Sequence, residues 1–357
     1  MAKGREKERK RFVVTCGGTG GHVFPGLAVA NELRARGHEV EVWLSGRSVE
    51  GKTLTAWDGP VFHTYAKPLS LHNLFPNIRS FFRCIRRFGA FKPDAVLAMG
   101  SYSSLPPVLA AHLKGVRIVL HEANAVPGKA VEFLSRYASC VAVSFPETAK
   151  HLKKREVKCT GLPVRRDLEG QPRYEEIPEG VFVFFVTGGS QGAHRLNEIA
   201  SQAAVLLDKE VHGRLFVLHQ TGAADEEWVR ACYEKAGVPN KTAAFFPDMG
   251  RAFASAGLVV ARAGASTCFE LAYLGKPALL VPLPSAVRDH QHLNAAALAA
   301  SGGADEARQG ELSGRSLMRY LKHKMENPMQ LRQMATAIRT LAVPEAASRV
   351  ADLLDRW

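Results

Sequence analysis

The sequence predicts an α/β protein of two Rossmann-like domains, each with a parallel sheet covered by helices. Short apolar runs of strand composition alternate with helix-like stretches along the chain, which is typical of a parallel sheet buried on both faces. The pattern also restarts, because FVVTCGGTGGH (12–22) and VFFVTGGSQGAH (183–194) share an apolar run, a threonine, paired glycines and a closing histidine. The chain has 357 residues, more than one hydrophobic core usually supports, so two domains facing each other are expected.

The individual elements follow from apolar runs bounded by Gly, Pro and polar residues. In the first half the expected strands are 12–16, 39–44, 95–99, 116–120 and 140–144, with helices at 25–36, 106–114 and 128–138. In the second half the expected strands are 181–187, 215–219, 243–246, 258–261 and 277–281. The domain boundary is expected in the polar stretch 161–180, and helices are expected from Gly314 to Trp357 with breaks at Pro328 and Pro344.

Composition excludes several classes of protein. Apolar residues make up 46% and charged residues 23%, as in a globular protein, and no apolar run approaches the ~18 residues of a spanning helix. The six cysteines lie far apart, which argues against a zinc site and a disulfide framework. Residues 1–11 carry six basic and two acidic residues with no apolar stretch behind them, so they predict a disordered arm rather than a secretory signal. The net charge of +13 suits a nucleotide diphosphate, an acidic lipid or a nucleic acid, among which charge does not choose.

The first glycine turn, Gly17–His22, leads from a strand toward a helix expected to start at Pro25. Glycines let the backbone approach a ligand, and the helix N-terminus stabilises a diphosphate. The alternative is a tight turn that binds nothing, which the second copy at 188–194 makes less favoured. The dinucleotide fingerprint GxGxxG fails at Val23. A formal phosphate-loop match at Gly46–Thr53 is disfavoured because Asp58-Gly59-Pro60 follows it where a helix should run.

Two further features suggest transfer chemistry. His22 closes the first turn, and an imidazole, with an ordinary pKa of about 6.5, could take a proton from an attacking hydroxyl. Arg262–Glu270 follows a strand, so its amides could face a phosphate while Glu270 binds a ribose diol. A backbone-bonded histidine and a helix-capping box are the alternatives. The chain has no DxD pair and no His/Asp/Glu cluster at metal-ligand spacing, so we predict no metal and no other cofactor.

Residues Asn77–Phe88 predict a basic amphipathic helix. Its apolar residues recur at helical spacing and arginines lie alongside. Such a helix suits an anionic membrane interface, and it equally suits packing on the sheet. The candidate membrane-contacting residues are Ile78, Phe81, Phe82, Ile85, Arg83, Arg86 and Arg87.

Six segments together resemble the MurG family, whose members add N-acetylglucosamine from UDP to an undecaprenyl-diphosphate-linked muramyl peptide, lipid I, and form lipid II. The segments are GGTGGHVFPGLAVA (17–30), GGSQGAHRLN (188–197), HQTG (219–222), FFPDM (245–249), RAGASTCFELAYLGKPALLVP (262–282) and DHQHLNA (289–295). The resemblance covers the chain from about Phe12 to its end and implies the GT-B fold, with two Rossmann-like domains around a cleft. The implied ranges are 12–165 for the acceptor and membrane-side domain, with a last helix at 344–357 packed back on it, and 166–343 for the UDP-sugar domain.

The resemblance also implies roles for individual residues. His22 takes the position of the acid-base residue. The implied UDP-N-acetylglucosamine contacts are Thr19, Gly20, Gly21, Asn124, Arg165, Ser190, the backbone of Phe246, Ala265, Ser266, Thr267, Cys268, Phe269, Glu270 and Gln291. Candidates on the acceptor side are Gly100, Tyr102 and Glu122. The family works at the cytoplasmic face of the cell membrane as a peripheral protein, and no nucleic-acid partner is expected.

The loop after the third strand departs from the family pattern GGYVSGPGG, because Gly100–Val108 reads GSYSSLPPV and four glycine positions carry side chains. Three functions therefore stay open at this point. The first is inverting transfer of N-acetylglucosamine to the 4-hydroxyl of lipid I. The second is the same chemistry on another lipid, such as a diacylglycerol or another polyprenyl lipid. The third is binding without catalysis, of a nucleotide sugar or of a nucleic acid.

Overall fold

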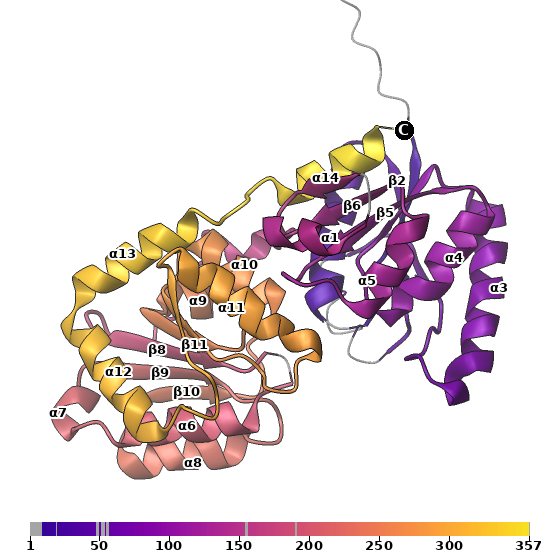
Figure 1. Ribbon diagram of the computed structural model, residues 1–357. Coiled ribbons are helices and arrows are strands. Elements are labelled where there is room, and N and C mark those ends of the chain that lie inside the picture. The colour runs from indigo at the N-terminus through magenta and orange to yellow at the C-terminus, as the bar shows by residue number, and fades with distance from the viewer. Residues whose placement is uncertain are drawn as a thin grey trace, which may run out of the picture. The chain divides into compact units, whose positions relative to one another are not determined.

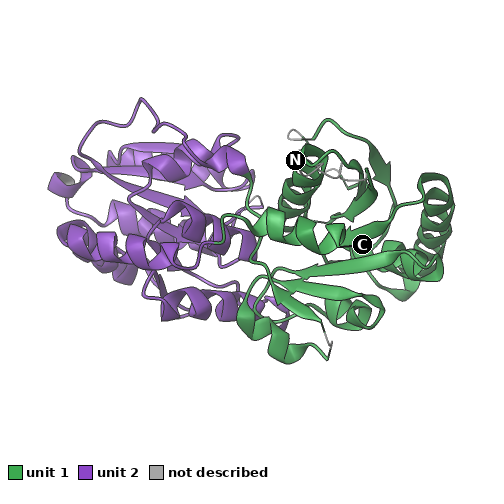
Figure 2. Ribbon diagram, turned by 90° about the horizontal axis from the view of Figure 1, so that it is seen from above, with its two compact units in different colours: residues 1–165, 343–357 green, residues 166–342 purple. Residues whose placement is uncertain are grey.

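Parallel strands and helices alternate through the whole chain and form two separate sheets, as the computed structural model shows (Figure 1). The structure describes residues 9–18, 20–47, 50, 54, 57–153, 156–189 and 191–356. Unit 1 comprises Met1–Arg165 and Val343–Trp357, and unit 2 comprises Arg166–Ala342 (Figure 2). The predicted fold class, with two Rossmann-like parallel sheets, is confirmed.

Unit 1 holds a seven-stranded parallel sheet in the order β3-β2-β1-β4-β5-β6-β7 within the described ranges. Its strands are β1 (Arg11–Thr15), β2 (Glu39–Leu44), β3 (Val61–His63), β4 (Ala95–Ala98), β5 (Arg117–Glu122), β6 (Cys140–Val143) and β7 (Val157–Cys159). Its α-helices are α1 (Gly20–Ala35), α3 (Leu74–Phe91), α4 (Leu105–Leu113), α5 (Lys129–Leu134) and α14 (Ala346–Asp355). The first strand is flanked by the second on one side and by the fourth on the other, as in a Rossmann fold.

Strand β1 is buried on both faces, because successive side chains of a strand point to opposite sides. Phe12 and Val14 belong to a core cluster that α1 and α14 cover. Val13 belongs to a second cluster on the other face, which α3, α4 and α5 cover. Continuous apolar strands are therefore required at this position, and this requirement explains why the sequence reveals them so clearly.

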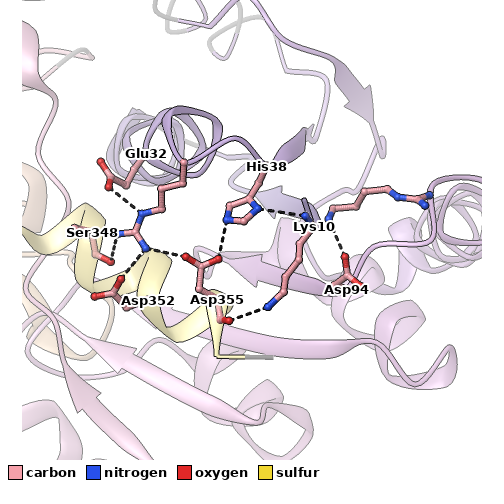
Figure 3. Close-up of polar contacts among 9 residues, drawn as sticks. Lys10, Glu32, His38, Asp94, Ser348, Asp352 and Asp355 are labelled. Carbon is pink, nitrogen blue, oxygen red and sulfur yellow. Dashed lines mark hydrogen bonds and ion pairs between the residues drawn. The ribbon is translucent and has the colours of Figure 1, made fainter. Parts of the chain in front are cut away.

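The last helix, α14, packs on α1 in unit 1 (Figure 1). Arg36, which follows α1, is the centre of this contact. Its guanidinium donates to three side chains of α14, those of Ser348 (2.6 Å), Asp352 (2.6 Å) and Asp355 (2.9 Å) (Figure 3). The same Asp355 carboxylate lies 2.8 Å from His38 Nε2, and the backbone carbonyl of Asp355 accepts from Lys10 Nζ at 2.9 Å. The end of the chain is thus tied to its beginning by charge-assisted hydrogen bonds.

Two expectations about unit 1 need correction. The basic arm was predicted to include Arg11, but Arg11 is the first residue of β1 and pairs with Glu39 of β2. Residues 1–8 lie outside the described residues. The helix expected from Pro25 begins at Gly20, so Pro25 lies inside α1 rather than at its start. Gly20 and Gly21, the last two glycines of the motif, are the first two residues of α1. Local sequence does not reveal such a shift of a helix boundary.

Unit 2 repeats the same sheet topology in the order β10-β9-β8-β11-β12-β13 over the residues described there. Its strands are β8 (Phe182–Thr187), β9 (Leu215–Gln220), β10 (Asn240–Ala243), β11 (Leu258–Ala261), β12 (Ala278–Leu280) and β13 (Ala304–Glu306). Its helices are α6 (His194–Val205), α7 (Lys209–His212), α8 (Glu226–Ala236), α9 (Met249–Ser255), α10 (Ala265–Leu274), α11 (His290–Ala300), α12 (Gly314–Glu326) and α13 (Pro328–Arg339). The expected helix breaks at Pro328 and Pro344 are confirmed, whereas the strand expected at 243–246 ends at Ala243.

A buried chain of hydrogen bonds connects α6, α8 and β9 in unit 2. Asn197 donates its amide protons to Asp225 Oδ2 (2.7 Å) and to the Thr221 carbonyl, so its Oδ1 accepts from His219 Nε2 (3.1 Å). His219 Nδ1 therefore carries the lone pair, which accepts from the Tyr233 hydroxyl at 2.8 Å. One neutral tautomer satisfies both neighbours, and burial lowers the pKa of His219 to about 3.

Acidification is expected to weaken unit 2 through His219. The unfolded chain takes up a proton below pH 6.5, whereas the folded unit does so only near pH 3, so the free energy of unfolding falls as the pH decreases between these values. The loss attributable to His219 between pH 7 and 5 is about 2 kcal/mol, measurable by urea unfolding. His219→Gln keeps one donor and one acceptor without titrating, so its free energy of unfolding should change less over the same range. His323→Gln, on the exposed side of α12, serves as the control. An unchanged pH dependence in His219→Gln contradicts this assignment.

Candidate active site

In each unit, the ends of the first and fourth strands meet at a topological switch point, where ligands of parallel sheets bind. In unit 1 these are β1 and β4, and in unit 2 they are β8 and β11. Both glycine turns follow the first strand of such a pair. The duplication in the sequence thus corresponds to the same place in two folds.

The first glycine turn is tightly packed inside unit 1. A Cβ at Gly17 would lie 2.5 Å from the Ser45 amide nitrogen, and Gly18 has a φ of 127°, which favours glycine. Gly20 and Gly21 form the start of α1. Thr19, predicted to contact the donor, lies outside the described residues.

The buried carboxylate of Glu50 holds this turn, a role that the sequence did not predict. Its Oε1 accepts from the amide of Gly18 at 2.7 Å, and its Oε2 accepts from the amide of Gly46 at 2.7 Å and that of Arg47 at 3.1 Å. The Ser45 hydroxyl also donates to it. The Gly18 amide is therefore directed at a protein carboxylate, so it is not one of the amides that the first turn could offer to a diphosphate. The formal phosphate-loop motif around Glu50 lies mostly outside the described residues.

His22 stands on the first turn of α1, between the ends of β1 and β4. Its Nδ1–H donates to the carbonyl of Met99 at 2.9 Å. This bond fixes the tautomer in which Nε2 carries the lone pair, and it orients the ring. The ring is half-buried, and its Cε1 lies 3.9 Å from the position of a Cβ at Gly100. The geometry suits a general base whose ring is oriented by a backbone carbonyl.

A second histidine, His121 at the end of β5, lies close to His22, which sequence reasoning missed. It is fully buried and its Nε2–H donates to the Gly161 carbonyl at 3.1 Å. Burial is the main cause that lowers the pKa of His121 to about 4, and the electrostatic effect of His22 lowers it further. His121 is thus neutral at physiological pH and adds no positive charge beside His22.

The acceptor-side candidates lie on neighbouring loops of unit 1. Gly100 has a φ of 85° at the end of β4, and the Tyr102 hydroxyl lies 3.4 Å from an Arg47 nitrogen. The Glu122 carboxylate accepts from the backbone amides of Asn124 and Gly128, both at 2.9 Å. Glu122 therefore shapes the loop that presents Asn124.

The second glycine turn faces β9 and the β10–α9 loop in unit 2. Gly192 has a φ of 74°, and a Cβ there would overlap the Thr221 carbonyl. Gln220 connects the two segments, since its Nε2 donates to the Gly189 carbonyl at 3.2 Å and its Oε1 accepts from the Phe246 amide at 2.9 Å. The predicted contact residue Phe246 is thereby fixed against this turn, with its carbonyl as the remaining polar group. Ser190 lies outside the described residues.

Helix α10 begins where β11 ends, directly beside the second turn. Its N-cap is Gly264, and no side chain caps the helix, which excludes the capping box considered as an alternative for Arg262–Glu270. Ser266, Thr267 and Glu270 are half-buried, whereas Ala265, Cys268 and Phe269 are buried. The last three could therefore offer a ligand mainly their backbone.

Three donor-side candidates lie elsewhere. Gln291 in α11 accepts from the Leu283 amide through its Oε1 at 3.0 Å. Arg165 and Asn124 belong to unit 1, where the Arg165 guanidinium stacks 4.6 Å from the centre of the Phe24 ring. Over the described ranges, no group of three or more His, Cys, Asp or Glu residues could hold a metal ion.

Helix α3 divides its apolar residues between the core and the surface. Cys84 and Phe88 are buried, and Phe81 and Ile85 pack partly against the same core cluster. Arg87 bonds the Glu41 carboxylate at 3.0 Å, so it is part of an ion pair. Phe81, Ile85 and Arg87 are therefore half-buried and also take part in the packing of unit 1, which leaves less of each for a membrane.

The exposed residues of α3 and of the segment just before it include apolar and basic side chains, which together we call the α3 patch. The patch reaches beyond the predicted residues, which began at Ile78, to the start of α3. Its members are Leu71, which precedes the helix, and the exposed α3 residues Leu74, Phe75, Ile78, Arg79, Phe82, Arg83 and Arg86. Phe75 and Phe82 expose 76% and 63% of their surface. Exposing large apolar side chains to water is unfavourable, which suggests that an apolar partner covers them. Among the described residues, no helix is both long and apolar enough to cross a membrane.

Comparisons with known proteins match most of the chain, in both units. The model of the glycosyltransferase family 28 N-terminal domain matches residues 12–143, and that of the family 28 C-terminal domain matches residues 183–350. The UDP-N-acetylglucosamine–N-acetylmuramyl-(pentapeptide) pyrophosphoryl-undecaprenol N-acetylglucosamine transferase of Cupriavidus metallidurans is 40% identical over 96% of this chain and 97% of its own. The enzyme of that name from Brucella abortus is 37% identical over 96% of this chain and 93% of its own.

Solved structures agree in fold. The crystal structure of Acinetobacter baumannii MurG superposes with a TM-score of 0.78 at 32% identity, covering 98% of this chain and all of that chain. The UDP-N-acetylglucosamine 2-epimerase of Neisseria meningitidis, solved with UDP-N-acetylglucosamine bound, has a TM-score of 0.74 at 13% identity, over 97% of this chain and 100% of its own. The latter likeness concerns the fold alone.

Proposed function

Because this chain belongs to the MurG family of N-acetylglucosamine transferases, we propose that His22 and the two glycine turns described above carry out the family's reaction. The chain is a hexosyltransferase that moves N-acetylglucosamine from UDP-N-acetylglucosamine to the undecaprenyl-diphosphate-linked muramyl pentapeptide, lipid I, and forms lipid II for peptidoglycan. The observation that carries the mechanism is the bond from His22 Nδ1–H to Met99. It leaves the Nε2 lone pair as the proton acceptor at the end of β1.

In the proposed step, Nε2 of His22 accepts the proton of the acceptor's 4-hydroxyl. The oxygen then attacks the anomeric carbon of N-acetylglucosamine, and the bond from this carbon to the diphosphate breaks with its electron pair leaving on UDP. Attack from the face opposite the leaving group inverts the anomeric centre. The neutral state of His121 favours this role, since a second imidazolium nearby would oppose protonation of His22.

On the donor side, unit 2 is proposed to bind UDP-N-acetylglucosamine. The N-terminus of α10 has no side-chain cap, so its amides suit the diphosphate and stabilise the departing charge. Glu270, one turn further, suits the ribose hydroxyls. The Phe246 amide is engaged by Gln220, so the Phe246 carbonyl is the group that would accept from a uracil N–H. Among the remaining implied contacts, Gln291, Asn124 and Arg165 stay proposals of the same kind.

The proposed reaction is tested by transfer of labelled N-acetylglucosamine from UDP to a lipid I analogue by the full-length protein. Diacylglycerol is offered in a parallel reaction, and each reaction is run with and without a chelator. We expect product only from the lipid I analogue and at the same rate with chelator. Transfer to diacylglycerol instead would overturn the acceptor assignment, and loss of activity with chelator would overturn the metal-independent mechanism.

We further propose that the α3 patch seats the protein peripherally on the cytoplasmic face of the membrane, where its lipid-linked acceptor is found. The exposed phenylalanines would enter the acyl boundary while the arginines reach anionic headgroups. Support comes from the side-by-side exposure of apolar and basic residues on one helix.

The membrane proposal predicts that Phe75→Ser with Phe82→Ser lowers the partition coefficient onto phosphatidylglycerol-containing vesicles by about 100-fold or more. Each buried phenylalanine contributes about 1.5–3 kcal/mol of transfer free energy. Leu206→Ser with Met329→Ser removes two exposed apolar residues of unit 2 and should leave binding unchanged. Vesicle sedimentation measures both. Equal binding by the α3 variant and the wild type would contradict the assignment.

A further inference from the structure

Ser101 has a backbone conformation that side-chain-bearing residues rarely adopt. Its φ is 68° and its ψ is 165°, a region that essentially only glycine populates. The residue lies in the loop between the end of β4 and α4, next to Gly100. Strain of this kind persists only where the surrounding structure or function requires it, and it concentrates at functional sites. A glycine here would remove the strain, yet the chain carries a serine.

The serine side chain lies at the first glycine turn. Ser101 Oγ is 2.9 Å from the position of a Cβ on Gly18, and Cδ2 of His22 is 3.9 Å from the same point. The hydroxyl and the imidazole are therefore neighbours at the end of β1. Gly18 leaves room for them, since a side chain at that position would meet Ser101 Oγ.

The Ser101 hydroxyl makes no hydrogen bond with any residue that the structure describes, and it does not cap the short helix that follows. The two next serines behave differently, since the Ser103 hydroxyl donates to the Gly17 carbonyl and the Ser104 hydroxyl donates to the Gly100 carbonyl. These two bonds hold the loop in place. The loop is thus fixed by its buried serines, while the half-buried Ser101 contributes no bond to the fold.

We propose that Ser101 is an acceptor-contacting specificity residue, whose hydroxyl hydrogen-bonds an oxygen of the acceptor sugar beside the hydroxyl that His22 deprotonates. Ser101 Oγ and the His22 ring both lie close to the position of a Cβ on Gly18. Both groups can therefore contact the same sugar ring. The inference rests on the role proposed for His22. It assigns a reason to the strain, because the serine offers a donor that glycine lacks.

The experiment compares Ser101→Ala and Ser101→Gly with the wild type, using full-length protein, UDP-N-acetylglucosamine and a lipid I analogue. Both variants lose the hydroxyl, so kcat/KM for the acceptor should fall about 3- to 10-fold, as expected for one neutral hydrogen bond. The KM for UDP-N-acetylglucosamine should stay within about twofold, since the proposed donor contacts lie mostly in unit 2. Only Ser101→Gly also relieves the backbone, and its Tm should rise by about 2–4 °C.

Lys92→Gly is the matched control. Lys92 is exposed, has a φ of 50° at the end of α3 and does not contact the glycine turn, so the substitution should raise the Tm without changing either kinetic constant. Acceptor kinetics of Ser101→Ala equal to those of the wild type would overturn the inference and leave the proposed function intact. An equal rise of both substrates' KM values would also overturn it. A wild-type protein that transfers nothing to the lipid I analogue would overturn the proposed function and this inference with it.

Discussion

Replacing His22 by alanine is expected to lower the turnover number with a lipid I analogue by about 10²- to 10⁴-fold, the usual contribution of a positioned general base. The reason is geometric. The Met99 carbonyl holds Nδ1–H, so the lone pair stands on Nε2, and alanine offers no proton acceptor at this place. The KM for UDP-N-acetylglucosamine should change little, because the proposed donor contacts lie mostly in unit 2. Steady-state kinetics with each substrate varied in turn measures both.

His194→Ala is the matched control for His22. His194 closes the second glycine turn at the equivalent position of the duplicated motif, but its ring is largely exposed and its Nδ1 bonds Asp225 at 2.8 Å. The hydrogen bond with the Asp225 carboxylate is the main cause that raises the pKa of His194. We expect His194→Ala to retain turnover within a few-fold. Wild-type turnover in His22→Ala, or an equal loss in both variants, would remove the general-base assignment.

Replacing Arg36 by methionine is expected to lower the free energy of unfolding of unit 1 by about 2–4 kcal/mol. The Arg36 side chain exposes 15% of its surface, and its guanidinium bonds three side chains of α14 (Figure 3). Its loss leaves the carboxylates of Asp352 and Asp355 beside one another without their shared cation. Urea unfolding in a Trp228→Phe background, where Trp43 and Trp57 report on unit 1, measures the change.

Arg349→Met is the control for Arg36. Arg349 lies on α14 itself and pairs with Glu345 in an exposed i,i+4 ion pair, which contributes at most about 0.5 kcal/mol. Its free energy of unfolding should therefore remain close to that of the wild type. If Arg36→Met proved as stable as Arg349→Met, the Arg36 contacts would not be what secures α14.

The glycine turns illustrate how far local sequence reaches. Their composition and their position after apolar strands predicted two turns between a strand and a helix, and the turns do follow β1 and β8. Local sequence did not indicate what the first turn binds inside the protein. Glu50 is 32 residues from Gly18 and reaches it only because β2 lies beside β1. An amide that looked available to a phosphate is thus used by a distant carboxylate.

The basic amphipathic helix shows a similar division. Its spacing predicted an apolar stripe with arginines, and both the core and the membrane interpretations were reasonable. The packing of α3 on the sheet divided the stripe, so that Phe88 is buried while Phe82 is exposed. Arg87 was removed from the candidate surface by Glu41, a residue of β2. Periodicity gives the helix and its faces, whereas the angle at which it packs decides which face meets water.

By itself, the sequence determined the alternation of strands and helices, the duplication, the two glycine turns and the family, because these features are written in neighbouring residues. Only the tertiary structure decided that His22 is oriented by Met99, that a neutral His121 stands beside it, and that Arg36 ties α14 to α1. Each of these contacts joins residues from different strands or helices. Their proximity depends on strand order, side-chain direction and burial, which arise only when distant segments pack together.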